Sequence, residues 1–599
     1  MSLNSRVCDR CIKKKVKCDL QRPSCSRCSE TDSPCIYSKE RRKPGPQRGA
    51  RRLASSARLS STNVPTHEAS QDDSPVRDSL LVNPLLDGGT TSQQFMPDLR
   101  ELSTNFSPVM IPTANQSRFP GYYLNPSQER DILLQFFEDV HSAIPLFQRD
   151  KFLRSYDEGA SFCDLVVTMV TVTTKILGPT DCWRSEDVDL CMNSLLAATA
   201  YENDSSSSQT GLDQFRQECL LAYYDFHQFP GPPAWMRISR LARRAYSMGL
   251  NQIEIPSLCS AYDAGLATED EIENWRYVWW CVYCLDSYSN ISLGAPFIID
   301  LESINTALVR RPYTDEEVPD LPKLFLPDDE DQLWRTAQDV VSSLCEKEFN
   351  IHIITTTILR QAGKILRLRA TRKPVHSKVA ALRSSLAALR LALPPRYLNP
   401  SRNVLIAESE AHHHIRLTNL LHLHMSRLIV ALPQDFKANE GEWLYGWQQS
   451  LETCQDIVLI IEQWNNQFSS RVDPAICLIA FVALWVTNLQ RRCLMDATGL
   501  LSDGLVRAES ILLLFLEQFS RMWALPSILI QLFNGLSTQD LLTYADVDRM
   551  INGLKMPLHP KTLHRAYAMS FSSTDLFGGF DIATDLADIW PFSTENLNI

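Results

Sequence analysis

The sequence is poor in glycine, and this scarcity bears on the fold class. Only 21 of the 599 residues are glycine, roughly half the usual share, which argues against nucleotide-binding α/β folds because these need glycine turns beside the phosphates. The sequence also shows no phosphate loop, nucleophile elbow, dinucleotide fingerprint or zinc-hydrolase motif. We therefore expect a protein that is not an enzyme.

Long apolar runs are also missing. The most apolar run, 474–486, is too short to span a bilayer and is expected to be a buried core helix, so no membrane partner is predicted. Residues 1–30 contain neither the apolar stretch nor the cleavage site of a secretory signal. This disfavours an oxidising compartment, in which the cysteines of the chain could form a disulfide framework.

Six cysteines stand close together at the start of the chain, in the pattern C-x2-C-x6-C, which then occurs a second time. A structural zinc ion takes four ligands and favours thiolates. Two ions need eight sulfur bonds, which six thiolates can supply only if two of them bridge, and the repeat offers Cys8 and Cys25 for this. The spacing therefore predicts two Zn²⁺ ions. The ligands are Cys8, Cys11, Cys18, Cys25, Cys28 and Cys35.

The residues between these cysteines are rich in lysine. Lys13, Lys14, Lys15 and Lys17 follow one another on a short segment predicted to be a helical turn, with Arg10 nearby. Two zinc ions and six thiolates carry a net charge of −2, so these cations exceed what the cluster needs. The surplus positive charge predicts contacts with the phosphates and base edges of double-stranded DNA.

The cysteine and lysine pattern resembles the DNA-binding domain of the fungal Zn(II)2Cys6 binuclear cluster transcription factors, and Pro23 matches the loop of that family. The resemblance implies that Lys14 and Lys15 reach a CGG triplet and that Lys17 and Arg22 contact phosphates. One position departs from the family pattern. Ile12 stands where the family usually has arginine, which puts one backbone contact in doubt.

Charge is divided unevenly along the chain. Residues 1–60 hold 16 Lys and Arg against 5 Asp and Glu, a net of +11, whereas the whole chain has −11, which leaves −22 for the other 539 residues. A second basic run with a proline-rich spacer follows the cysteines and predicts nuclear import, although the same side chains could also follow DNA phosphates or a minor groove. The import residues are Arg41, Arg42, Lys43, Arg51 and Arg52.

Residues 59–120 are rich in Ser, Thr, Pro, Asn, Gln and Asp and predict a disordered linker. Residues 53–100 show no apolar heptad, so the sequence does not support dimerisation through a coiled coil there.

Order is expected to resume at Asn125, which begins a capping box with Gln128, and Thr268 begins another with Glu271. Helices are expected over 215–226, 235–248, 332–371, 404–432, 445–468, 475–497 and 503–521.

The middle of the chain resembles a second family, the fungal-specific transcription factor domain. The resemblance is carried by Phe136-Phe137 with His141 and Pro145-Leu146-Phe147, by Ala242-Arg243-Arg244-Ala245 with Met248-Gly249-Leu250, and by Trp275-Arg276, Trp279-Trp280, Asp286 and Gly294-Ala295-Pro296. It implies an all-helical regulatory domain, of a kind suspected of sensing a metabolite or a partner. For Trp275 and Trp279 we favour packing in the core over contact with a ligand.

Other metal-ligating residue types occur in the helical region. Five histidines lie on one leucine-rich helical stretch, where neighbouring side chains point in different directions, so a metal site is not expected. Cys281 and Cys284 lack a second pair nearby, and the eleven cysteines outside the cluster are expected to be buried apolar residues of a reduced protein. The histidines are His412, His413, His414, His422 and His424.

The end of the chain combines acidic and apolar residues. Residues 570–599 contain five Asp and Glu, no Lys or Arg, and eleven large apolar residues, nine of which lie from Phe571 to Phe592. This composition predicts a disordered activation segment that binds coactivators, with Phe577, Phe580 and Trp590 as its anchors. The alternative is a final amphipathic piece, Asp581 to Trp590, that docks on the helical domain.

The predicted fold is mostly α, with four parts: a Zn2Cys6 DNA-binding domain (1–43), a basic and then disordered linker (44–120), a helical domain (121–560) and an acidic-aromatic tail (565–599). The predicted function is a nuclear, zinc-dependent, sequence-specific transcription factor, an RNA polymerase II activator of a metabolic pathway or gene cluster. The alternatives are a repressor with the same DNA-binding domain, or a sensor whose helical domain takes a small-molecule inducer.

Overall fold

The computed structural model describes most of the chain between Cys8 and Gly553. The described residues are 8–14, 16–31, 33–37, 119–159, 162–180, 182–201, 211–260, 268–310, 322–433, 436, 439–493, 499–536 and 542–553. Lys15, the predicted import residues, the linker up to residue 118 and the acidic tail lie outside this part. The chain divides into two compact units, Met1–Asn105 and Phe106–Ile599.

The first unit is held together by its cysteines. It contains two short helices, α1 (Asp9–Lys14) and α2 (Ser26–Ser29), each of which begins just after the first cysteine of one C-x2-C-x6-C half. Its buried cluster consists of Cys8, Cys11, Cys25 and Cys28, with Cys18, Cys35 and Tyr37 packed against them. In the described residues no aliphatic side chain belongs to this cluster, so the described part of the unit is held by cysteines rather than by an aliphatic core.

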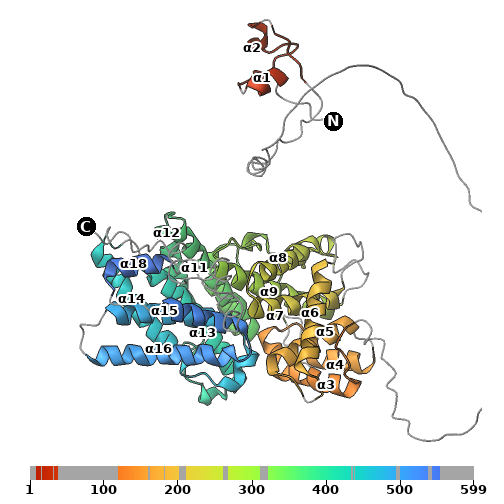
Figure 1. Ribbon diagram of the computed structural model, residues 1–599, viewed down its shortest axis with the longest axis vertical. Coiled ribbons are helices and arrows are strands. Elements are labelled where there is room, and N and C mark those ends of the chain that lie inside the picture. The colour runs from red at the N-terminus through yellow and green to blue at the C-terminus, as the bar shows by residue number, and fades with distance from the viewer. Residues whose placement is uncertain are drawn as a thin grey trace, which may run out of the picture. The chain divides into compact units, whose positions relative to one another are not determined.

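The second unit is a stack of helices, and its described residues form no β-strand (Figure 1). Its N-terminal half consists of α3 (Pro126–Gln135), which continues into a π-helical turn at Phe136–Val140, and the helices up to α9, the longest helix in the described residues. These helices are α4 (Arg149–Asp157), α5 (Cys163–Leu177), α6 (Ser185–Tyr201), α7 (Leu212–Gln228), α8 (Pro232–Ser247) and α9 (Glu269–Leu293).

The C-terminal half packs consecutive long helices against one another. Helix α11 packs on α13, α13 on α14, α14 on α15 and α15 on α16, and Figure 1 shows α14, α15 and α16 lying side by side. The helices are α10 (Leu333–Ser342), α11 (Glu348–Ala370), α12 (His376–Ala392), α13 (Glu410–Ala431), α14 (Glu440–Ile461), α15 (Ile476–Cys493), α16 (Gly499–Ser520), α17 (Ala524–Leu536) and α18 (Tyr544–Gly553). The mostly helical fold predicted from the sequence is confirmed.

Both capping boxes predicted from the sequence are present. The Asn125 side chain accepts from the Gln128 backbone N–H, and the Gln128 side chain accepts from Asn125 N in return. Thr268 and Glu271 make the same reciprocal pair at the start of α9. Such pairs satisfy backbone donors that a helix start leaves open, and they need only residues three apart, which is why the sequence shows them.

Three predicted helices differ from the structure. The helix predicted over 445–468 is α14, Glu440–Ile461, and the residues Asn466–Arg471 form a separate 3-10 turn. The stretch 332–371 is not one helix, because Ser343 is extended after α10 and the chain passes through 343–347 before α11 begins at Glu348. The predicted helix over 404–432 begins only at Glu410. A 3-10 turn at Val404–Ile406 precedes it, and Ala407 has a left-handed φ of 53°, which stops helix growth there.

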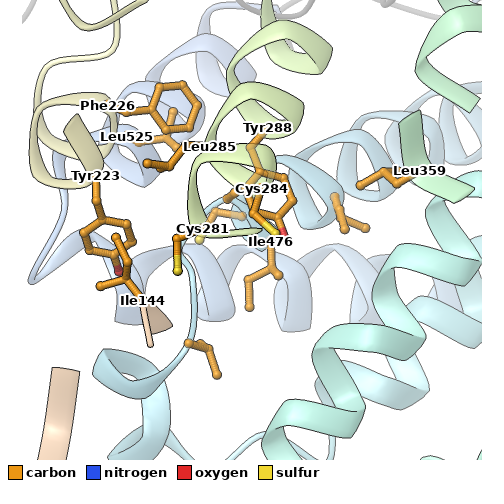
Figure 2. Packing of buried hydrophobic residues seen from close by; sticks show 14 of the residues in the cluster. Ile144, Tyr223, Phe226, Cys281, Cys284, Leu285, Tyr288, Leu359, Ile476 and Leu525 are labelled. Atoms are coloured by element: carbon orange, nitrogen blue, oxygen red, sulfur yellow. The ribbon is translucent and has the colours of Figure 1, made fainter. Parts of the chain in front are cut away.

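One continuous core runs through the second unit, from Phe119 to Ile551. Figure 2 shows its centre, where side chains from α7, α9, α11, α15 and α17 meet. Helix α15 is long and apolar enough to cross a membrane by length and composition, but 83% of it is buried inside the unit. It therefore packs as a core helix, as the sequence predicted for 474–486.

Helix α9 places charged side chains inside this core. The fully buried Arg276 side chain binds Glu254 (2.8 Å), Glu269 (2.8 Å) and Glu273 (2.6 Å). One turn of helix further along, Trp280 donates from Nε1 to the backbone carbonyl of Ala307 at 2.8 Å. These contacts tie the non-helical segment after α9 back onto the helix.

Candidate metal centre and nucleic-acid interface

The six N-terminal cysteines form two groups of four sulfur atoms. One group is Cys8, Cys11, Cys18 and Cys25, and the other is Cys8, Cys25, Cys28 and Cys35, with all sulfurs of a group within 4.8 Å of one another. Cys8 and Cys25 belong to both groups. The two cysteines that the repeat offered as bridging ligands are therefore the two that the fold places between the sites.

The distances between sulfurs fit zinc coordination. The Sγ atom of Cys8 lies 3.8 Å from those of Cys25 and Cys28, and Cys11 Sγ lies 3.8 Å from Cys25 Sγ. A tetrahedral zinc ion with Zn–S bonds of about 2.3 Å requires sulfur–sulfur edges of about 3.8 Å. The residues present thus fit the metal, and zinc held here would supply the cross-links between the two halves of the unit.

Backbone hydrogen bonds and burial act in opposite directions on these thiols. The N–H groups of Cys8 and Leu20 lower the pKa of Cys18 to about 6, and the N–H of Cys25 lowers the pKa of Cys35 to about 7. Burial raises the pKa of Cys8, Cys11, Cys25 and Cys28. A cation is needed to keep these four buried thiols in the thiolate form, which is the form that binds zinc.

Several contacts outside the cysteines hold the two halves of this unit together. Asp9 N donates to the carbonyl of Ile36 at 2.9 Å. Arg10 donates to the Thr31 hydroxyl. Tyr37 donates to the carbonyl of Gln21 at 2.8 Å, so the end of the unit packs over its central loop.

Three of the four predicted DNA-contacting residues are described by the structure, and all three lie on the surface of this unit. Lys14 is exposed in the last turn of α1, and Lys17 is exposed just after it. The Arg22 guanidinium lies over the Tyr37 ring, 5.1 Å from its centroid, and the residue remains exposed. The sequence alone did not indicate this contact between Arg22 and Tyr37, because the two residues are 15 positions apart.

The five histidines of α13 each face a different neighbour. His413 Nε2 lies 2.8 Å from the carbonyl of Pro400, whereas His414 accepts at Nε2 from Asn465 N at 2.9 Å. His422 lies 3.3 Å from the Tyr288 hydroxyl, and the other two histidines lie near the carboxylates of Glu348 and Asp456. Among the described residues, only the two cysteine groups bring three or more metal-ligating side chains together.

A cavity of 340 Å³ lies between the two halves of the helical unit. Tyr223, Cys281 and Cys284 line one side, and burial raises the pKa of all three side chains. Figure 2 shows the Tyr223 ring extending from α7 toward Ile144 and Cys281. The buried Tyr223 hydroxyl has no hydrogen-bond partner in the described part of the chain.

The tryptophans expected in the core lie there. Trp275 packs edge to face on Phe215, and Trp279 packs edge to face on Tyr246. Neither tryptophan is among the residues that line the cavity. Gly294 ends α9 in the left-handed conformation with φ 69°, where glycine is favoured.

A zinc-type cysteine cluster on a small basic unit, together with a large all-helical unit, defines a zinc-cluster regulator of transcription. The chain belongs to the family with the fungal specific transcription factor domain, whose model matches residues 133–473, more than half of the chain. The model of the fungal Zn(2)-Cys(6) binuclear cluster domain matches residues 6–44, so zinc binding by the cysteine cluster and DNA binding by this domain follow.

Three curated proteins illustrate the similarity. The azaphilone cluster-specific transcription factor azaR of Aspergillus niger is 24% identical over 315 residues, which cover 52% of this chain and 62% of that protein. The citrinin biosynthesis transcriptional activator mrl3 of Monascus ruber is 21% identical, covering 51% and 63%. An ABC-transporter-regulating transcription factor of Aspergillus fumigatus is 40% identical over 47 residues, 8% of this chain and 5% of that protein.

The matched region thus spans somewhat less than two thirds of the longer-matching relatives. No solved structure matches the chain.

Proposed function

We propose that this protein is a nuclear, zinc-dependent activator of RNA polymerase II transcription, specific for one metabolic pathway or gene cluster, which reads CGG-like triplets. The observation that carries the proposal is the pair of four-thiol sites sharing Cys8 and Cys25, next to the lysine-bearing end of α1. Relatives named for individual biosynthetic clusters support pathway specificity. Two zinc ions per chain are part of the proposal.

In the proposed complex, Lys14 and Lys15 contact base edges, and Lys17 and Arg22 contact phosphates. The cation of Arg22 is positioned by the Tyr37 ring, which limits its rotamers without covering it. Selection of random DNA by the full-length protein tests the readout directly. A consensus without a CGG-like triplet would remove this part of the proposal.

Replacing Lys15 by alanine is expected to relax the preference for a G-containing triplet, because a lost base-edge contact costs about 1–3 kcal/mol in discrimination. Replacing Lys17 is expected to weaken binding evenly across sequences and to reduce its salt dependence, because a phosphate contact carries no sequence information. Binding titrations of matched and mismatched DNA at several salt concentrations measure both effects.

The control for this pair is Lys378→Ala, which removes an exposed lysine of α12 in the second unit and should change neither property. An identical change of sequence preference in the Lys15 and Lys17 variants would contradict the division of roles.

For nuclear entry, the supporting feature is the basic run with Arg41, Arg42, Lys43, Arg51 and Arg52. For activation, the supporting feature is the acidic-aromatic composition of the C-terminal segment, which suits binding to coactivators.

A fusion of residues 565–599 to an unrelated DNA-binding domain is expected to activate a reporter. Changing Phe577, Phe580 and Trp590 together to alanine should abolish this output, because burial of the three rings is the proposed source of coactivator affinity. The matched control changes Asn596 and Asn598 to alanine in the same fusion and should retain activity. An inactive parent fusion, or one that tolerates the triple change, would favour the repressor alternative.

A small-molecule inducer is a second candidate partner, favoured by the cavity beside Tyr223. Its volume is within the range of ligand sites, and an unpaired buried hydroxyl is a group that a ligand acceptor could satisfy after a small side-chain movement. A thermal-shift screen of the full-length protein against metabolites tests this proposal, with Tyr223→Phe as the variant that distinguishes binding at this cavity.

A further inference from the structure

Helices α12, α13 and α14 enclose a groove of 560 Å³ on the surface of the helical unit. Helix α13 contributes the floor with residues such as Leu423 and Val430, and α12 and α14 contribute side chains on either side. The groove differs from the cavity beside Tyr223, with which it shares no lining residue.

The groove carries apolar surface that no described residue covers. Tyr445 is 62% exposed and Leu459 is 51% exposed, although both are large apolar side chains on α14. Leu386 of α12 is only partly buried. Apolar side chains grouped in a concave surface are typical of a site where another segment binds.

One wall of the groove is cationic. Arg383 and Arg390 are exposed on α12, and because they are seven residues apart they share a face with Leu386. Neither arginine has an acidic partner among the described residues, whereas Arg427 of α13 is paired with Asp456 of α14 at 2.6 Å. The two arginines of α12 are thus available to an anionic partner.

The sequence around this wall is also rich in positive charge over a longer stretch. Residues 349–407 contain eleven Lys and Arg and no Asp or Glu. Residues 570–599 contain five Asp and Glu and no Lys or Arg. These two segments are complementary in charge within a chain that is acidic overall.

The spacing of the acidic residues also matches the groove. Asp581 and Asp588 are seven residues apart, as are Arg383 and Arg390, and seven residues of helix rise about 10.5 Å. With Asp585 between them, these carboxylates would share one helix face. Ile582, Leu586 and Ile589 have the same i, i+4, i+7 spacing, one position further along.

The described chain ends on α14, one of the three helices that form the groove. Helix α18 is held on α14 by a hydrogen bond from Trp443 Nε1 to Asp548 Oδ1 (2.9 Å) and by packing of Trp443 on Tyr544, with ring centroids 5.6 Å apart. Trp443 and the groove residue Tyr445 are two positions apart on α14 and point to different sides of that helix, so α18 packs on another face of α14 than the groove. Figure 1 shows α18 next to α14.

A short connection leads from α18 to the acidic segment. The 16 residues 554–569 can extend to roughly 50 Å. A tether of this length gives an effective concentration on the order of mM, so even a weakly binding segment would occupy a site on its own chain.

We propose that residues 570–599 bind this groove in cis, with Asp581 and Asp588 on Arg383 and Arg390 and the apolar residues of 582–590 against Tyr445 and Leu459. The consequence for regulation rests on the proposed function. If Phe577, Phe580 and Trp590 contact coactivators, binding of residues 570–599 to the groove competes with coactivator binding. A signal that weakens binding to the groove would then release the segment.

Hydrogen–deuterium exchange of the full-length protein, read peptide by peptide, tests the contact. The double variant Arg383→Glu, Arg390→Glu is expected to raise the exchange rate in residues 570–599 by about fivefold or more. Coupling between two sites in a protein typically changes an equilibrium constant by at least about this factor. Adding Asp581→Arg and Asp588→Arg should restore the protection, because the charges are then exchanged between the partners.

The control is Arg243→Glu with Arg521→Glu, two other exposed arginines without a partner in the described chain and outside the groove; it should leave exchange in 570–599 unchanged. Equal exchange in the wild-type protein and the groove variant overturns the inference. Protection that grows with protein concentration also overturns it, in favour of a second copy as the occupant. The measurement does not depend on activation, so an inactive tail fusion counts against the proposed function alone.

Discussion

Full-length protein treated with a zinc chelator is expected to lose specific DNA binding by a factor of at least about a thousand, which is the usual margin over non-specific binding. The reason is that the described residues of the first unit bury a cluster of cysteines in place of an aliphatic core, so the free energy of metal binding is its folding free energy. Binding to the selected DNA sequence, before and after zinc is added back, measures the loss and its recovery.

The sharing of Cys8 and Cys25 also predicts how many zinc ions each cysteine variant keeps. Cys8→Ala or Cys25→Ala removes a ligand from both four-thiol groups and is expected to reduce zinc from two ions per chain to none. Cys18→Ala removes a ligand from only one group, so about one ion should remain. Elemental analysis of the purified protein gives the stoichiometry.

Cys454→Ala is the matched control, since Cys454 is a buried cysteine of α14 far along the chain from the cluster. It should leave zinc content unchanged. One zinc ion in the wild-type protein, or two in the Cys8 variant, would contradict the shared-ligand arrangement.

Asp286→Ala is expected to lower the free energy of unfolding of the helical unit by about 3–5 kcal/mol, because it leaves a buried arginine without its counter-charge. Asp286 accepts from Arg360 Nη1 at 3.1 Å and from the backbone N–H groups of Ile298 and Ile299, both at 3.1 Å. Both side chains of the ion pair are buried, 0% and 4% exposed. Urea unfolding followed by tryptophan fluorescence measures the change.

The comparison for this prediction is Asp270→Ala, which breaks the ion pair of Asp270 with Lys151. These side chains are 49% and 43% exposed, so the change should cost less than about 1 kcal/mol. A similar loss in both variants would show that the Asp286 pair is no more important than a surface pair.

The zinc cluster could be predicted from the sequence almost completely, because its ligands lie within 28 residues and zinc geometry dictates their number and type. The capping boxes at Asn125 and Thr268 were predictable for the same reason, since each involves residues three apart. The family resemblance covered Asp286 and Arg276 as matching positions. It did not indicate that either would be buried with charged partners.

Helix boundaries could be predicted only in part. A periodic apolar pattern continues through 332–371, but the chain leaves the helix at Ser343 and starts a new one at Glu348. Likewise, Ala407 adopts a left-handed φ that its sequence neighbours do not suggest. At both places packing of the surrounding helices prevails over local propensity, which contributes only tenths of a kcal/mol per residue.

The sequence by itself determined the mostly helical class, the metal centre and the DNA-binding character, because each depends on residues close together in the chain. Only the tertiary structure decided that Arg360 meets Asp286 across 74 residues, that a cavity opens beside Tyr223, and that Arg383 and Arg390 line a groove formed with α13 and α14. These features arise where distant helices pack together, and periodicity along one helix does not specify which other helix it will face.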